Sequence, residues 1–351
     1  MRKSLRLVAL AAATTLAVGF ISVPSASAAT KVKVGLAYYI GGRGDKSFND
    51  SAAAGLIRAE KTLGVTAKEV TVTVGSDQER EAKLRLLAKA GYNPIIAVGY
   101  LYAGPLKKVA LDYPTVQFGI IDDASIDLLN VASLVFSANE GSYLAGVAAA
   151  LASKSGKIGY VGGVRIPLLQ AFEAGFVAGV KATKKSATVL VKYVSEPPDF
   201  SGFSDPGKMK VIVKGMIDKG IDVVYSAAGG SGAGNFQAAT EAAAAGKKVW
   251  AIGVDSDQYL TASAAEKKIT LTSAVKRVDN AVYDVIAASV RGSSVNDILD
   301  AKAGIYGRLY NLAKGGVGVS YSGGYITMYK AQIDAASKAI ISGKIKVPTA
   351  P

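Results

Sequence analysis

Six turns of this chain combine glycine with carboxylate and aromatic side chains, which are groups that can hold a small molecule. They read YYIGGRGDKSFND, VGYLYAGP, IIDDAS, VGGVRIP, AAGGSGAGNF and GVDSDQ. Among their carboxylates and phenyl rings are those of Asp122, Asp123, Asp255, Asp257, Phe48 and Phe236. Aromatic faces stack on flat rings, and carboxylates accept hydrogen bonds from hydroxyl or amine groups. The pattern favours a neutral ligand with a flat ring and several hydroxyl groups, and it suits a phosphorylated ligand poorly.

The composition excludes several kinds of catalysis. The chain has no Cys and no His, and Ser-His-Asp catalysis, Cys-His catalysis and the common zinc sites all need those residues. The turn AAGGSGAGNF matches neither glycine pattern of nucleotide-binding loops, and no His exists to activate Ser231 within it. Asp255 and Asp257 lack the other residues of a calcium loop. We therefore expect no metal, no cofactor and no enzymatic activity.

The elements that carry these turns alternate between strand and helix patterns. From Val32 the near-continuous apolar runs VKVGLAYY, AKEVTVTV, NPIIAVG and VQFGIID read as buried parallel strands with helices between them. The same alternation begins again after NVASLVF. Because 351 residues are many for one core, the sequence predicts an α/β fold of two doubly wound parallel-sheet lobes. Ligands of such folds bind at the carboxyl ends of strands and between domains.

Phe48 in the turn GGRGDKSFND has two readings. An apolar residue at a helix N-terminus can pack on the next turn of the helix, or the ring can face a ligand. Composition alone does not choose between them. The tripeptide Arg43-Gly44-Asp45 resembles an adhesion signal, but three residues recur by chance, so we interpret the whole turn as part of a binding site.

The N-terminus and the net charge bear on location. Residues 1–28 have basic residues, an apolar run and a small-residue site that ends in Ala26-Ser27-Ala28, which predicts a signal peptide cleaved near Ala28. An uncleaved membrane anchor fits less well, because Thr14 and Thr15 interrupt the apolar run. The net charge is +14, but the Lys residues are spread over helix faces, so we expect no nucleic-acid partner.

Six longer stretches, in order along the chain, carry a family resemblance. They are DKSFND, SLVFSANEGSYLAGVAAALASKSGKIGYVGG, QAFEAGFVAGVKA, DVVYSAAGGSGAGNFQAA, AIGVDSDQ and TSAVKRVDNAVYDVI. From about Val32 to about Gly343 the chain resembles the basic membrane protein family of ABC-transporter substrate-binding proteins, of the purine nucleoside receptor type. The resemblance implies an extracytoplasmic protein, acting as a monomer, that passes a nucleoside to ABC permease and ATPase subunits and meets the membrane only indirectly.

The resemblance also implies a type I periplasmic-binding-protein fold, in which hinge crossovers join the lobes. It places the crossovers near Ser137 to Gly141, near Asp255 to Tyr259, and near Asn311 to Gly316. The N-terminal lobe would then combine residues 30–138 with 257–311. The C-terminal lobe would combine residues 139–256 with 312–351.

Residue roles follow from the resemblance in the same way. It implies that Phe48 and Phe236 sandwich the purine, that Asn49 and Asp122 contact the base, and that Asp255 and Lys276 hold the ribose hydroxyls. An Asp and a Lys can bracket neighbouring hydroxyls as acceptor and donor. Gly230 of the glycine-rich turn completes the expected site, together with Tyr39.

Two departures from the family pattern separate this chain from its relatives. Tyr39 stands where the family usually has an Asp that reads the base, so a different ring-bearing or polyol ligand is an alternative. The lipid-anchor Cys is missing, so we expect a protein secreted free or held by a partner or the wall. A nucleoside-acting enzyme that uses Asp255 or Asp122 as its general base, or a ligand sensor, are further alternatives.

Overall fold

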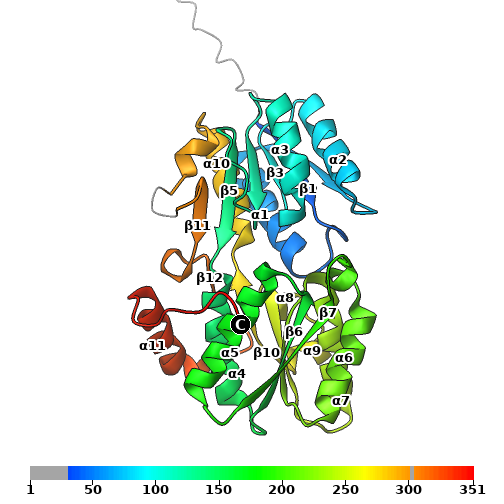
Figure 1. The fold of residues 1–351 in the computed structure, drawn as a ribbon, viewed down its shortest axis with the longest axis vertical. Coiled ribbons are helices and arrows are strands. Elements are labelled where there is room, and N and C mark those ends of the chain that lie inside the picture. Colours follow the sequence, from blue (N-terminus) through cyan, green and yellow to red (C-terminus); the bar gives the residue numbers. More distant parts are fainter. Residues whose placement is uncertain (1–30, 301–303) are drawn as a thin grey trace, which may run out of the picture. The chain divides into compact units, whose positions relative to one another are not determined.

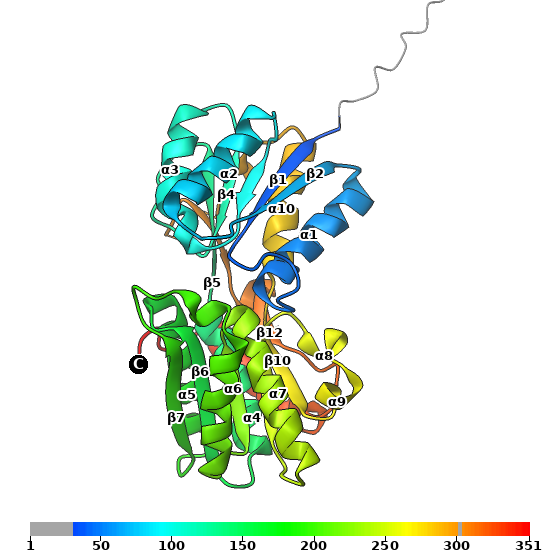
Figure 2. The ribbon, with the colours of Figure 1, turned by 90° about the vertical axis from the view of Figure 1, so that its right-hand side faces the viewer.

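Two six-stranded sheets organise the chain, and helices cover both faces of each (Figures 1 and 2). The computed structural model describes residues 31–300 and 304–351, so the predicted signal peptide, residues 1–28, lies outside the described residues. Contacts group Val32–Pro351 into one unit. We call the parts built on the first and second sheets the first and second lobes.

The first sheet is entirely parallel, in the order β11-β5-β4-β3-β1-β2. Its strands are β1 (Lys33–Tyr38), β2 (Thr66–Thr71), β3 (Ile95–Ala97), β4 (Phe118–Ile121), β5 (Val131–Phe136) and β11 (Gly307–Tyr310). Helices α1 (Phe48–Leu63) and α10 (Val278–Val290) pack on one face, and α2 (Asp77–Lys89) and α3 (Ala103–Asp112) pack on the other. Burial on both faces explains why these strands are apolar runs rather than alternating ones.

The second sheet has the order β12-β10-β9-β8-β6-β7 and is parallel except for β12, which runs antiparallel to β10. Its strands are β6 (Lys157–Val164), β7 (Thr188–Ser195), β8 (Val223–Ala227), β9 (Trp250–Asp255), β10 (Thr270–Lys276) and β12 (Val317–Val319). This architecture confirms the predicted fold class of two doubly wound α/β lobes.

Four long helices cover the second sheet, two on each face. They are α4 (Ala138–Ala152), α5 (Pro167–Thr183), α6 (Pro206–Asp218) and α7 (Ala233–Ala244). The close packing of α4 on α5 depends on Gly175 and Gly179, because a Cβ atom there would collide with the backbone carbonyls of Asn139 and Tyr143.

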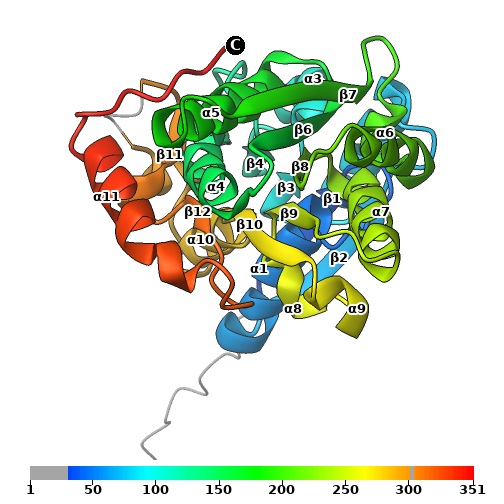
Figure 3. The ribbon, with the colours of Figure 1, turned by 90° about the horizontal axis from the view of Figure 1, so that it is seen from below.

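Two four-residue helices and one longer helix complete the second lobe. They are α8 (Gln258–Thr261), α9 (Ala264–Lys267) and α11 (Lys330–Ile341). Helix α11 lies beside α4 (Figure 3) and contributes Ile333 and Ile340 to the core around α4 and α5. In the described part of the chain, no helix is both long and apolar enough to cross a bilayer.

The chain passes between the two sheets three times, at Ser137, at Arg277 and over Asn311–Gly316. Backbone hydrogen bonds tie these segments together: Ser137 N–H donates to the Tyr310 carbonyl at 3.0 Å, and Arg277 N–H donates to the Gly316 carbonyl at 2.9 Å. The three crossing segments therefore lie next to one another and form one hinge.

One of the expected crossovers is wrong. We placed the second crossing near Asp255 to Tyr259 and assigned residues 257–311 to the first lobe. Instead, β10 pairs with β9 in the second sheet, and the chain crosses only after Lys276. The physical reason is that α8 and α9 return the chain to the same sheet. There β10 pairs between β9 and the edge strand β12.

Candidate ligand site

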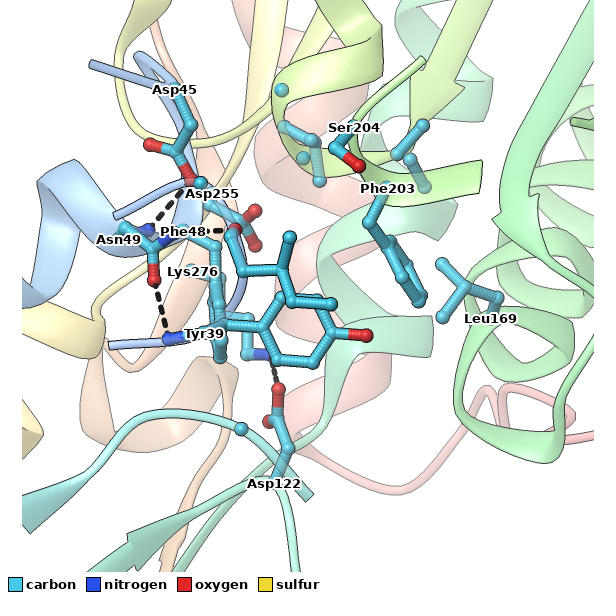
Figure 4. A pocket seen from close by; sticks show the side chains of 18 of the residues that line it. Tyr39, Asp45, Phe48, Asn49, Asp122, Leu169, Phe203, Ser204, Asp255 and Lys276 are labelled. Atoms are coloured by element: carbon cyan, nitrogen blue, oxygen red, sulfur yellow. Dashed lines mark hydrogen bonds and ion pairs between the residues drawn. The ribbon is translucent and has the colours of Figure 1, made fainter. Parts of the chain in front are cut away.

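A cavity of about 260 Å³ is lined by turns at the carboxyl ends of strands from both sheets (Figure 4). Seven of the eight predicted site residues line it, namely Tyr39, Phe48, Asn49, Asp122, Gly230, Asp255 and Lys276. The common edge of parallel strands explains this convergence, because every strand-to-helix turn of such a sheet opens on the same side.

The eighth residue, Phe236, does not line the cavity. It lies one turn into α7, is 4% exposed, and packs with Met209 and Val213 of α6 in the core of the second lobe. A short 3-10 turn, Gly229–Gly232, separates β8 from α7. This turn brings Gly230 to the cavity and leaves Phe236 facing α6, so the predicted second face of the aromatic clamp is wrong.

Phe203 takes the place in the cavity that we had expected for Phe236. It ends the 3-10 turn Ser201–Phe203 that follows β7, and its ring meets Tyr39 edge to face, with ring centres 5.6 Å apart (Figure 4). Phe172 of α5 lines the same cavity. The sequence signal for Phe203 is its position, because EPPDFSGFSD follows the carboxyl end of a strand, as the six turns named above do.

Lys276 and Asp122 form a buried ion pair across the two lobes. Lys276 is the last residue of β10 and Asp122 follows β4, and the distance from Nζ to Oδ2 is 2.5 Å. Their side chains are 3% and 4% exposed. The ammonium group also lies 4.8 Å from the ring centre of Phe48 and 5.0 Å from that of Phe136, which is within the range of cation–π attraction.

Asp255 is the second buried carboxylate of the site. Its Oδ2 accepts a hydrogen bond of 2.7 Å from the Ser47 hydroxyl, and the Ser256 hydroxyl donates to the Ser47 carbonyl at 2.8 Å. Burial raises the pKa of Asp255 to about 6, and the charge of Lys276 and the bond from Ser47 oppose that rise. Ser47 precedes α1 of the first lobe, so these bonds hold the lobes together beside the cavity.

The two carboxylate residues of the site, Asp122 and Asp255, have an uncommon backbone conformation. The φ angles are +66° at Asp122 and +62° at Asp255, in the left-handed region that few non-glycine residues adopt. In each case the residue ends a strand or directly follows it, where the chain turns sharply. Such conformations concentrate at functional sites, where the surrounding structure holds them in place.

Asp45 stabilises the N-terminus of α1 through hydrogen bonds to its backbone. Its carboxylate accepts from the backbone N–H groups of Ser47, Asn49 and Asp50 at 2.8–3.1 Å, which satisfies free helix donors and places Phe48 at the cavity. Burial raises the pKa of Asp45, and these three bonds oppose the rise. The side-chain oxygen of Asn49 accepts from the Tyr39 N–H at 3.2 Å, so Asn49 also fixes the start of the turn.

Arg43 is held on the rim of the cavity. Its Nε and Nη2 atoms donate to the two carboxylate oxygens of Glu69 at 2.6 and 2.7 Å. An arginine engaged in this two-bond pair is positioned within the turn, which agrees with the interpretation of GGRGDKSFND as part of a site.

Two α/β lobes, three neighbouring crossovers and a cavity between the strand ends are the architecture of solute-binding proteins of the periplasmic-binding type. A family model described as "ABC transporter substrate-binding protein PnrA-like" matches residues 31–350. The chain belongs to this family, whose members serve ABC transporters and act outside the cytoplasm.

Individual relatives agree with this assignment. A CD4+ T-cell-stimulating antigen of Listeria monocytogenes is 36% identical, over 89% of this chain and 86% of its own. The ABC transporter nucleoside-binding protein BmpA of Lactococcus lactis is 32% identical, over 91% and 90%. A solved solute-binding protein of an ABC transporter system from Aeropyrum pernix is 30% identical, with a TM-score of 0.76, over 91% of this chain and 93% of its own.

Proposed function

We propose that this protein binds a nucleoside in the cavity between its lobes and delivers it to an ABC permease without changing it chemically. The observation that carries the proposal is one cavity lined by both aromatic rings, Phe48 and Phe203, and hydroxyl-binding groups, Asp255 and Lys276. A nucleoside has these two parts, a flat base and a ribose with neighbouring hydroxyls. The printed name of the Lactococcus relative supports the same ligand class.

The base would lie against Phe48, with Phe203 rather than Phe236 as the aromatic group from the second lobe. Asn49 and Asp122 would face the edge of the base, and the backbone at Gly230 would approach it closely. The ribose hydroxyls would donate to Asp255 and accept from Lys276. A purine would present a larger flat face to these rings than a pyrimidine would.

Binding would act by stabilising the closed arrangement of the lobes. Residues of both lobes contribute to the cavity, so a ligand gains its full set of contacts only when the lobes are together. The bonds from Ser47 to Asp255 and from Ser256 to Ser47 already join the lobes beside the cavity. The ligand would add to them, and the closed monomer would be the form that the permease receives.

Isothermal titration calorimetry tests the proposal. The mature protein, first stripped of bound ligand by partial unfolding and refolding, is titrated with the common purine and pyrimidine nucleosides, and free ribose serves as the control. We expect saturable binding of at least one nucleoside and much weaker binding of ribose. Lack of saturable binding to any nucleoside would sink the proposal. Recovery of the bound nucleoside unchanged after long incubation would distinguish a carrier from an enzyme.

A different ring-bearing ligand is the second candidate, and Tyr39 favours it. Its ring projects into the cavity and contacts Phe203, so it occupies space that a smaller side chain would leave to the ligand (Figure 4). Tighter binding of a non-nucleoside ring compound than of every nucleoside in the same titration would favour this candidate.

A further inference from the structure

Three buried polar atoms around the cavity have no hydrogen-bond partner among the described residues. They are the hydroxyl oxygens of Tyr39 and Tyr100 and the Oδ1 atom of Asp122. All three residues line the cavity. Buried polar atoms in folded proteins are nearly always paired, and leaving one unpaired is costly. Three in one cavity therefore indicate where a ligand makes its polar contacts.

The fold places these three groups side by side. Tyr39 follows β1, Tyr100 begins the 3-10 turn Tyr100–Tyr102 after β3, and Asp122 follows β4. These three strands are neighbours in the first sheet. The groups consequently form one row at the carboxyl edge of that sheet, and we call this row the reading edge.

The two phenols remain protonated at neutral pH, so each offers an O–H donor. Burial raises the pKa of Tyr100 to about 12, and the nearby charge of Asp122 adds to the rise. Burial also raises the pKa of Tyr39, with Tyr100 as a second cause. Asp122 contributes an acceptor, since its other oxygen is held by Lys276 and Oδ1 is left for a ligand.

A base with a keto group next to a ring N–H matches two donors and one acceptor. The keto oxygen has two lone pairs and can accept from both phenols, while the ring N–H donates to the Asp122 carboxylate. A base with an amine in place of the keto group presents a ring nitrogen with a single lone pair. One phenol O–H would then have no acceptor on the base.

We propose that Tyr39, Tyr100 and Asp122 select nucleosides whose base has a keto group beside a ring N–H over nucleosides whose base has an amine there. Inosine and uridine belong to the first class, and adenosine and cytidine belong to the second. This inference rests on the proposed nucleoside binding and names the feature of the base that the reading edge recognises.

Two matched pairs of ligands test the inference by calorimetry on the stripped mature protein. Inosine is compared with adenosine, and uridine with cytidine, since each pair differs in the keto or amine edge alone. Whichever pair binds, the keto member should bind roughly 10- to 100-fold more tightly, as expected for one buried hydroxyl left unpaired. Equal affinities, or tighter binding of the amine member, would overturn the inference while leaving nucleoside binding intact.

Conservative variants test whether the hydroxyl groups of Tyr39 and Tyr100 cause the preference for the keto base. Tyr39→Phe and Tyr100→Phe each remove one hydroxyl and keep the ring. The phenol that remains can pair with the keto oxygen or with the ring nitrogen, so no donor is left over with either base, and each variant should lower the ratio about tenfold. Tyr92→Phe is the matched control, because Tyr92 is a half-buried tyrosine of the same lobe outside the cavity, and it should keep the wild-type ratio.

The outcomes of the two proposals are separable. A wild-type ratio in both cavity variants would show that the phenols do not read the base, and would overturn the inference even if the keto member binds better. If no nucleoside binds the wild-type protein, the proposed function itself fails and the inference fails with it. If one variant does not fold, the other variant and the wild-type pairs still decide the question.

Discussion

Lys276 and Asp122 connect the two lobes through an ion pair of 2.5 Å that is almost completely buried. Lys276 stands at the last position before the second crossover, so the charge that neutralises Asp122 comes from the other lobe. Two charges removed from water stay stable only while they remain paired. The relationship makes the contact between the lobes part of the stability of the fold as well as part of the ligand site.

Removing the Lys276 charge should destabilise the protein. Lys276→Met leaves the buried Asp122 carboxylate without its partner, and we expect the free energy of unfolding to fall by about 3–5 kcal/mol. Asp122→Asn in addition should recover part of the loss, because no unpaired charge then remains. Urea unfolding followed by circular dichroism measures both. Lys330→Met, in the exposed pair with Asp334, is the control and should leave the midpoint almost unchanged. A Lys276→Met midpoint equal to wild type would refute the prediction.

The three Phe residues should separate into binding and stability roles. Phe48→Ala and Phe203→Ala should each weaken nucleoside binding by about 1–3 kcal/mol, the range for base stacking on aromatic side chains. Phe236→Ala should lower the free energy of unfolding by about 3–5 kcal/mol, because it leaves a cavity in the core between α6 and α7. Calorimetry and urea unfolding of all three variants provide the comparison. Weaker binding by a stably folded Phe236→Ala protein would contradict the assignment.

Ionisation of Asp255 should lower the stability of the unliganded protein. Burial raises its pKa from 3.8 to about 6, so the folded state holds the proton more tightly than the unfolded chain does. Its contribution to stability is present in full below the unfolded pKa and is lost as pH rises through about 6. Asp255→Asn removes this titration. The free energy of unfolding of wild type minus that of the variant should therefore decrease between about pH 4 and about pH 7. A constant difference over that range would argue against a raised pKa.

The Ser47 hydroxyl should contribute to ligand affinity through Asp255. Ser47→Ala removes the 2.7 Å bond that joins the lobes beside the cavity, and hydrogen bonds to charged groups are worth about 1.5–3 kcal/mol. We expect weaker nucleoside binding, because both closure and the orientation of the Asp255 carboxylate depend on this bond. Ser153→Ala, which removes a hydroxyl that donates to Asp222 outside the cavity, is the control. Unchanged affinity in Ser47→Ala would show that the bond does not support binding.

Which carboxylates line the cavity could be predicted from the sequence where strand ends alone determine position. Asp122 and Asp255 directly follow or end apolar strands, so their place at the cavity follows from parallel-sheet geometry. Lys276 is different, because only the family resemblance implies its role, and the structure shows it as the last residue of a strand, β10. The α/β fold could be predicted for the same reason, because apolar runs and helix patterns alternate along the chain.

The errors arose where local turns changed the direction of a side chain or of the chain. Phe236 follows a glycine-rich turn in the sequence, but the 3-10 turn before α7 directs its ring to the core. Phe203 lies in an irregular turn without a glycine-rich motif, and the sequence signal for it is its position after the strand β7. The second crossover was misplaced because α8 and α9 are too short for periodicity to show that they return the chain to the same sheet.

The left-handed backbone at Asp122 and Asp255 has a consequence for redesign of the pocket. Among residues with a side chain, Asn and Asp are the ones that accept this conformation most readily, so most other side chains at these two positions would cost about 1–2 kcal/mol of backbone strain each. Tyr39, Tyr100 and Phe203 line the same pocket and have no positive φ angle. Substitutions meant to change the ligand preference should therefore be made at these three aromatic positions, and Asp122 and Asp255 should be kept.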